Sequence, residues 1–150
     1  MIKFEFKNKK TGKKETYEKE CITLGEAETF YDLREKIDKE YEKARVKAKN
    51  EVEKEHGNAA EFINSDLYDQ LIQQHFTQNV EGRKIRKMER DYFVGLFEDQ
   101  GLSEDDVLSN MSTKVYNQIT KEIFREISGE DEESNQDESE ELGKNGEQSQ

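Results

Sequence analysis

Apolar and charged residues alternate strictly at the start of the chain. In the segment IKFEFK, Ile2, Phe4 and Phe6 fall on one face of an extended strand, and charged residues fall on the other. The following NKKTGKK predicts a turn around Gly12, and ETYEKECI predicts a weaker returning strand. Because a two-stranded hairpin is only marginally stable alone, we expect its apolar face to rest on helices.

After the hairpin, apolar residues recur at helical spacing. Thr23 and Glu26 have the spacing of a capping box, with Thr23 as the N-cap of a long helix. Gly57, followed by an asparagine, predicts the end of that helix. The apolar residues along one face of this helix recur with a spacing closer to an 11-residue than to a 7-residue repeat. We therefore expect the helix to pack on its own domain, with a coiled coil as the alternative. The stripe contains Phe30, Leu33, Ile37, Tyr41, Ala44, Ala48 and Val52.

The remaining pattern predicts four more helices. The second begins at about Ala59 or Ser65 and ends near Gln78, and the third runs from about Arg83 to Asp99, with Gly101 just past its end. A short helix starts at a cap formed by Ser103 and Asp106, and the last helix starts near Ser112 or Thr113 and ends at Gly129. The inward side of the second helix is expected to carry Ile63, Leu67, Leu71 and His75.

Composition changes sharply at residue 129. The last 22 positions contain one large apolar residue, Leu142, and nine carboxylates against a single lysine. Such a segment cannot bury enough apolar surface to offset its ordering entropy, so we expect residues 129–150 to be a disordered acidic tail. Of the formal net charge of −12, the first 128 residues carry only −4. The predicted fold is mainly α with a small N-terminal β-hairpin (α+β), as a single helical domain over residues 1–128.

The sequence offers few candidate residues for catalysis or for binding a cofactor or metal. The chain has one cysteine and two histidines, and it shows no phosphate-binding glycine loop, zinc spacing or calcium loop. We interpret Cys21 as a small hydrophobe near a strand end and His75 as a packing residue. We therefore expect no enzyme activity, no cofactor and no metal. A single cysteine and the absence of a long apolar stretch favour a cytoplasmic location without a membrane partner.

One basic cluster stands out in the first turns of the third predicted helix. It could be a solvated helix face, a surface that contacts nucleic-acid phosphates, or a docking site for an acidic segment. The net charge of −4 gives no extended positive field, so nucleic-acid binding, in a small regulatory protein, is the alternative function and not the leading one. Its candidate contacts are Arg83, Lys84, Arg86, Lys87 and Arg90.

Apolar residues cover more than one side of the third predicted helix. Either this helix is buried on all sides, or one side faces a partner such as an amphipathic helix. Because Ile85, Tyr92 and Leu96 already fill the inward stripe, we expect Phe93 to be buried and Phe97 to be partly exposed. On the last helix, Tyr116 and Phe124 could likewise be either buried or facing a partner. The candidate partner-binding residues are Tyr92, Phe93, Leu96, Phe97, Tyr116 and Phe124.

Two blocks of the chain resemble one family. The segment IKFEFKNKKTGKKETYEKECITLGEAETFYDLREKI is similar to the start of tail assembly chaperones of long-tailed phages that infect Gram-positive bacteria. The block DYFVGLFEDQGLSEDDVLSNMSTKVYNQITKEIFREI resembles the same family, with an aromatic helix, a glutamine-containing turn, a short acidic helix and a final isoleucine-rich helix. Together the two blocks, residues 2–37 and 91–127, cover about half of the chain.

The resemblance implies a small α-rich protein of the host cytoplasm. Members of this family bind the tape measure protein, keep it soluble and competent for tail-tube assembly, and leave before the tail is complete. The major tail protein and a second copy of the chain are further candidate partners. Such chaperones are often made in a short form and in a longer, frameshifted form, and an acidic ending suits the short form.

Overall fold

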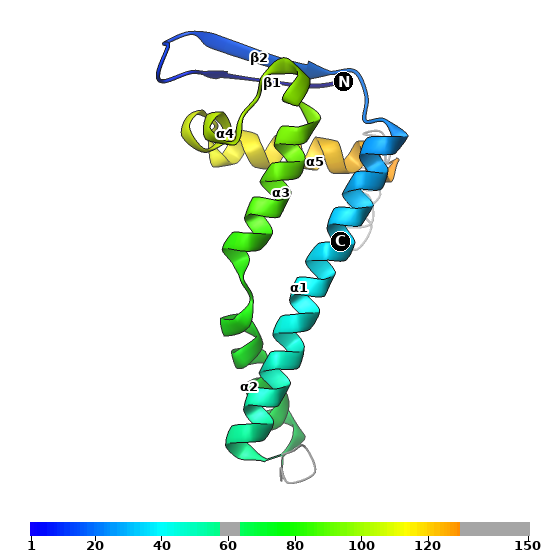
Figure 1. Ribbon diagram of the computed structural model, residues 1–150, viewed down its shortest axis with the longest axis vertical. Helices are drawn as coiled ribbons and strands as arrows, with labels where there is room; N and C mark the ends of the chain where they lie inside the picture. The colour runs from blue at the N-terminus through cyan, green and yellow to red at the C-terminus, as the bar shows by residue number, and fades with distance from the viewer. Residues whose placement is uncertain (58–63, 130–150) are drawn as a thin grey trace, which may run out of the picture. The chain divides into compact units, whose positions relative to one another are not determined.

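The computed structural model describes residues 1–57 and 64–129 (Figure 1). The alternative helix start at Ala59, the inward position of Ile63 and the predicted tail after Gly129 lie outside these residues. The described chain divides into two compact units, which we call the hairpin unit (residues 1–27 and 93–129) and the helical unit (residues 28–57 and 64–92). Their elements are β1 (Ile2–Lys7), β2 (Lys14–Lys19), α1 (Leu24–His56), α2 (Ser65–Asn79), α3 (Gly82–Leu96), η2 (Glu98–Gln100), α4 (Glu104–Asn110) and α5 (Thr113–Ser128).

The predicted N-terminal hairpin is confirmed. β1 and β2 pair antiparallel, with Phe4 opposite Tyr17, and the apolar side chains of β1 are buried while its charged ones are exposed. Gly12 has a φ of 71° in the turn, where a side chain would be strained. β2 is shorter than the predicted returning strand, because the chain leaves the ladder after Lys19. The amide of Ile22 donates instead to Glu126 Oε2 at 3.1 Å.

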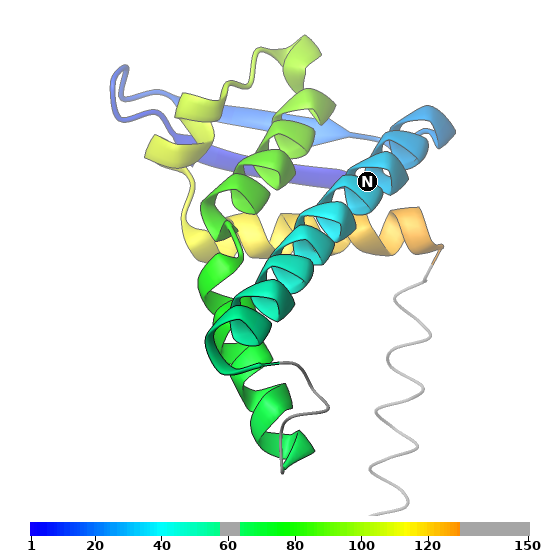
Figure 2. The ribbon, with the colours of Figure 1, turned by 60° about the horizontal axis from the view of Figure 1, so that its bottom comes forward.

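In the hairpin unit, α5 lies alongside β1 (Figure 2). Both predicted capping boxes in this unit are present: Thr23 and Glu26 bond each other's main-chain amides, and Ser103 and Asp106 do the same at the start of α4. Ser112 caps α5 through a bond from the amide of Val115. The unit's core takes its buried side chains from the hairpin, from the end of α3 and from the segments that follow it: Ile2, Phe4, Phe6, Tyr17, Phe93, Leu96, Phe97, Leu102, Val107, Ile119 and Ile123.

The third helix ends earlier than the pattern predicts. α3 stops at Leu96, and the chain continues as the short helix η2 instead of reaching Asp99 in an α-helix. The reason is local: the carbonyl of Phe97 accepts hydrogen bonds from the amides of Gln100 and Leu102, which tightens the turn. Gly101, at a φ of 87°, then redirects the chain.

Gln100 joins this turn to the hairpin. Its side-chain Nε2 donates to the carbonyl of Glu18 at 2.8 Å, and its Oε1 accepts from the amide of Glu18 at 3.1 Å. The amide side chain thus imitates a paired strand residue on the outer edge of β2. No pattern in the sequence predicts this contact, because it joins residues 82 positions apart.

The helical unit is built on the predicted stripe of α1. Leu33, Ile37, Ala44, Ala48 and Val52 are buried, which confirms five of its seven positions. Of the other two stripe residues, Phe30 is partly buried and Tyr41 is exposed. A small core forms where Leu33 and Ile37 meet Ile85 of α3, surrounded by Phe30, Val80, Met88 and Tyr92.

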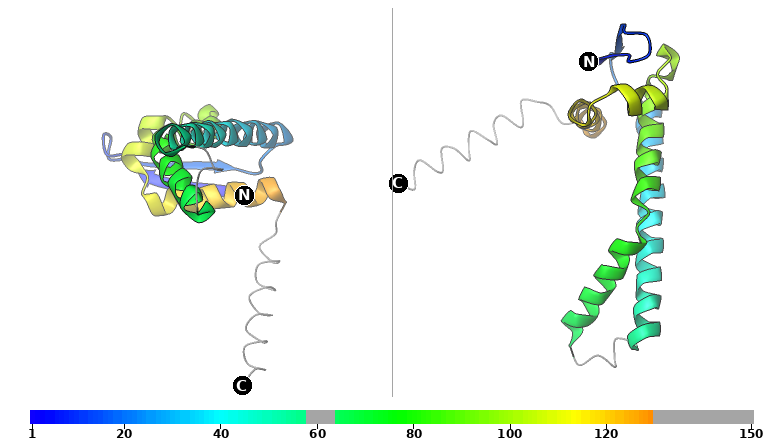
Figure 3. Two further views of the ribbon diagram at one scale, coloured as in Figure 1. Left: turned by 90° about the horizontal axis from the view of Figure 1, so that it is seen from below. Right: turned by 90° about the vertical axis from the view of Figure 1, so that its left-hand side faces the viewer.

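α2 returns along the C-terminal half of α1 (Figure 3), and its predicted inward side is only partly correct, since Leu71 and His75 are partly buried but Leu67 is not. Leu67 was expected inside and is 47% exposed, whereas Tyr68 is buried. The Tyr68 hydroxyl donates to Glu53 on α1 at 3.2 Å, which fixes the orientation of the first turn. The prediction failed at Leu67 because two apolar stripes are possible on this helix, and only the position of α1 decides between them.

The described chain is thus mainly helical with one small antiparallel hairpin, as predicted. Within residues 1–57 and 64–129, none of the helices combines the length and the apolar character needed to cross a membrane.

Candidate functional site

The aromatic residues of α3 and the segment after it form a core, not a surface. The Phe97 ring packs edge-on against Phe4, with 5.0 Å between ring centroids, and Phe93 lies 5.6 Å from Phe97 and 5.1 Å from Tyr116. Phe93 is 2% exposed and Phe97 is fully buried. The expectation that Phe97 is partly exposed is therefore wrong: the hairpin covers the side of the helix that the sequence left open.

The six candidate partner-binding residues therefore differ in accessibility. Phe93, Leu96 and Phe97 are buried, and Tyr116 is partly buried in the same unit. Tyr92 belongs to the helical unit, where its ring packs 5.6 Å from Phe30. Phe124 on α5 is the one that presents a large part of its surface, with half of it exposed.

The basic cluster at the start of α3 has carboxylate neighbours of its own. Lys84 Nζ lies 3.0 Å from Glu40 Oε1 on α1 and 3.8 Å from Glu81, and Lys87 pairs with Asp91 at 3.2 Å. The hydrogen bond from Lys84 lowers the pKa of Glu40, and the same bond raises the pKa of Lys84. Arg83 and Arg86 are exposed, and Arg90 is partly buried. This pairing favours a solvated helix face over a phosphate-binding surface.

His75 lies between α2 and α1. Its Nδ1 is 2.8 Å from Glu51 Oε2, and its Nε2 is 3.5 Å from Glu55 Oε2. Asn79 Nδ2 also donates to Glu51 Oε2, at 3.2 Å. The hydrogen bond from Asn79, followed by the one from His75, lowers the pKa of Glu51. His75 therefore packs inward as expected, but it does so within a polar contact. Cys21, which the sequence analysis interprets as a small hydrophobe near a strand end, lies just after β2 and is exposed.

The Glu51 contact predicts a pH dependence of stability. Because the pKa of Glu51 is lower in the folded chain than its usual 4.5, its contribution is present above that value and is lost as the pH falls through the lower folded pKa. Urea midpoints measured between about pH 6 and pH 3 should fall less steeply for Glu51→Gln than for the unaltered chain. Glu42→Gln, at an exposed site on the same helix, serves as the control and should follow the unaltered chain. Parallel curves for Glu51→Gln and the unaltered chain would contradict the assignment.

A second basic cluster lies at the hairpin turn, where the sequence pattern predicts only a turn. The stretch KNKKTGKK contains five lysines in eight positions, the same number of cations as the first turns of α3. These lysines are Lys7, Lys9, Lys10, Lys13 and Lys14. The turn is braced at its base by Glu15, which accepts from Asn8 Nδ2 at 3.2 Å and from the Tyr17 hydroxyl at 3.1 Å. Burial and then the bond to Glu15 raise the pKa of Tyr17 to about 12. The density of lysines is visible in the sequence, but the same residues also match a simple turn around Gly12.

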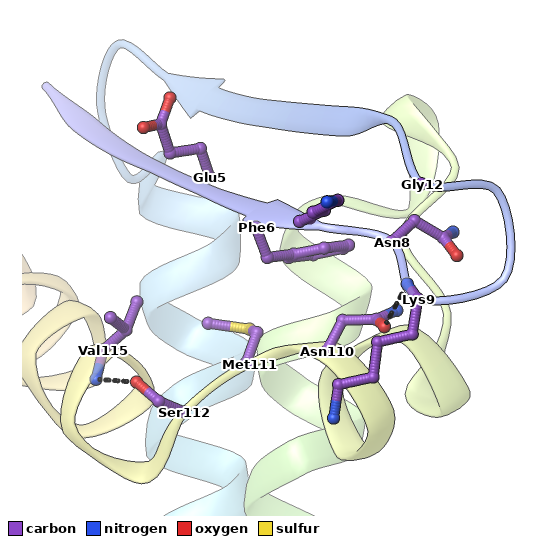
Figure 4. A pocket seen from close by; sticks show the side chains of 10 residues that line it. Glu5, Phe6, Asn8, Lys9, Gly12, Asn110, Met111, Ser112 and Val115 are labelled. Atoms are coloured by element: carbon purple, nitrogen blue, oxygen red, sulfur yellow. Dashed lines mark hydrogen bonds between the residues drawn. The ribbon is translucent and has the colours of Figure 1, made fainter.

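Beside this turn the hairpin unit has an open pocket of about 650 Å³ (Figure 4). Its apolar wall is Phe6 of β1 together with Met111 and Val115 from the junction of α4 and α5. Lys7 and Lys9 line it on the hairpin side. The amide of Lys9 donates to Asn110 Oδ1 at 3.0 Å, which ties the turn to the end of α4. An apolar wall with cationic neighbours suits an apolar ligand that carries negative charge.

Among the described residues there is no group of three or more histidine, cysteine or carboxylate side chains placed to hold a metal ion. The described residues do include a half-exposed aromatic on α5 and an open pocket beside a basic turn. In comparisons with known proteins, no protein-family model, no curated protein and no solved structure matches the chain.

Proposed function

We propose that this chain is a phage tail assembly chaperone, a binding protein and not an enzyme, that acts in the cytoplasm of the bacterial host. The proposal comes from the resemblance of residues 2–37 and 91–127 to that family. Its main support is that the hairpin of the first block and most of the second block form one folded unit. Phe4 packs on Phe97, and Glu18 is bonded to Gln100, so each block completes the other.

The proposed partner is the tape measure protein, with the major tail protein and a second copy of the chain as further candidates. A tape measure is a very long helical protein with apolar stripes, and keeping it soluble requires apolar contacts on a soluble body. Phe124 supports such a contact, because it is a large aromatic with half of its surface exposed on an amphipathic helix. We place the tape measure contact at Phe124. Tyr116 lies eight residues earlier on α5, about two helical turns away, and is partly buried against Phe93.

Co-expression tests the proposal. The tape measure protein encoded in the same gene cluster should be soluble when it is expressed with this chain and should aggregate when it is expressed alone. A tape measure that is equally soluble without the chain would refute the function. Phe124→Ser should lower the soluble yield, whereas Val46→Ser, at a site of almost the same exposure in the helical unit, should not.

A further inference from the structure

The outer edge of β1 carries main-chain groups that point away from β2. In an antiparallel pair, opposite residues alternate between bonded pairs and pairs whose amides and carbonyls face outward. The amide of Asn8 donates to the carbonyl of Lys13, so this pair is a bonded one. Bonded pairs recur at every second residue of the register, so Phe6 and Phe4 are also in bonded pairs. Glu5 and Lys7 belong to the alternate pairs, and their main-chain amides and carbonyls therefore face outward.

Two contacts confirm this alternation. Glu18, opposite Lys3, faces outward on β2, where Gln100 occupies its amide and carbonyl. Lys9, two residues beyond Lys7, uses its amide to reach Asn110. Between these contacts, the outward groups of Glu5 and Lys7 have no hydrogen-bond partner within the described part of the chain. The edge of β2 is therefore covered at Glu18, while the edge of β1 is open at Glu5 and Lys7.

The open edge of β1 adjoins the pocket. Glu5, Phe6 and Lys7 all line it, and in Figure 4 the side chains of Met111 and Val115 lie below β1, on the side away from β2. A strand added to β1 would find main-chain partners along the edge and an apolar wall under every second side chain. The pocket volume falls within the roughly 300–1,000 Å³ typical of ligand sites.

The lysines beside the open edge of β1 indicate which kind of strand would bind there. Lys10 is paired with Asp105 and Lys14 with Glu5, but Lys7, Lys9 and Lys13 have no carboxylate partner among residues 1–57 and 64–129. Lysines on an edge strand discourage pairing with a second basic edge. A second copy of this hairpin would bring like charges together, whereas a strand with acidic side chains would complement them.

We propose that the edge of β1 is a strand-addition site for an extended segment of a partner protein in which apolar and acidic residues alternate. The apolar side chains contact Phe6, Met111 and Val115, and the acidic ones face Lys7 and Lys9. The main chain of the segment pairs with Glu5 and Lys7. This inference does not depend on the proposed function, because it concerns a different surface from Phe124 and a different kind of ligand from a helix.

A peptide titration tests the site on the full chain. The probe is an eight-residue fluorescent peptide of alternating valine and glutamate with blocked ends, followed by anisotropy. The same peptide with lysine in place of glutamate tests charge, and the glutamate peptide with alternate main-chain amides methylated tests strand pairing. We expect the glutamate peptide to bind at least about tenfold more tightly than either control, a difference of about 1.4 kcal/mol or more. It should also slow hydrogen exchange at the amides of Glu5 and Lys7.

Variants localise the effect. Lys7→Glu with Lys9→Glu should weaken binding of the glutamate peptide at least about tenfold. Lys36→Glu with Lys49→Glu makes the same change of net charge at exposed sites on α1 and should leave binding within about twofold. Equal binding of the methylated peptide, equal binding of the lysine peptide, or unchanged exchange at Glu5 and Lys7 would each overturn the proposal. Tighter binding at Glu5 and Lys7 by a synthetic peptide of residues 130–150 would also overturn it, because the occupant would then be the chain's own terminus.

Discussion

Phe97→Ala is expected to destabilise the chain by about 3–5 kcal/mol, the usual cost of removing a fully buried phenylalanine. The Phe97 ring is completely buried and packs against Phe4 and Phe93, so its loss leaves a cavity between the hairpin and the end of α3. Against a typical total stability of about 5–15 kcal/mol, this change would unfold a marginal domain. Urea unfolding followed by circular dichroism measures it.

Phe124→Ala is the matched control, since it removes the same ring from a half-exposed site. We expect it to cost less than about 1 kcal/mol. If Phe97→Ala stayed within about 1 kcal/mol of the unaltered chain and lost partner binding instead, the ring would belong to an interface and the core described above would be wrong.

Ile37→Ala is expected to destabilise the helical unit by about 2–5 kcal/mol. Ile37 is 2% exposed and packs with the buried Leu33 and Ile85 in the core of the helical unit, so its truncation leaves a cavity there. Thermal unfolding followed by circular dichroism should show the loss. Val46→Ala on the same helix should change stability by less than about 0.5 kcal/mol, because nearly half of Val46 is exposed. Equal losses for the two variants would contradict the assignment of the core.

Elements set by local spacing could be predicted from the sequence. The alternation of Ile2, Phe4 and Phe6 identified β1, and the caps at Thr23 and Ser103 located two helix starts to the residue. The stripe of α1 was largely correct, because its buried positions follow one regular repeat. These features depend on residues within a few positions of one another, which is the range that a sequence pattern describes.

Features set by distant residues could not be predicted in the same way. A helix with two apolar faces does not say which one its neighbours will cover, so the predictions for Leu67 and Phe97 were both wrong. The bond between Gln100 and Glu18 depends on the fold itself. The lysines of the hairpin turn were visible in the sequence, but their significance depends on the open edge and the pocket beside them, which only the structure reveals.

Size-exclusion chromatography with light scattering on co-expressed, co-purified protein tests the central claim most directly. A tape measure chaperone should elute with the tape measure protein as one particle whose mass accounts for both chains, and Phe124→Ser should reduce the amount of that particle while the chain itself stays folded. Two separate peaks, each with the mass of one protein alone, would show that the chain does not bind the tape measure protein and would contradict the proposed function.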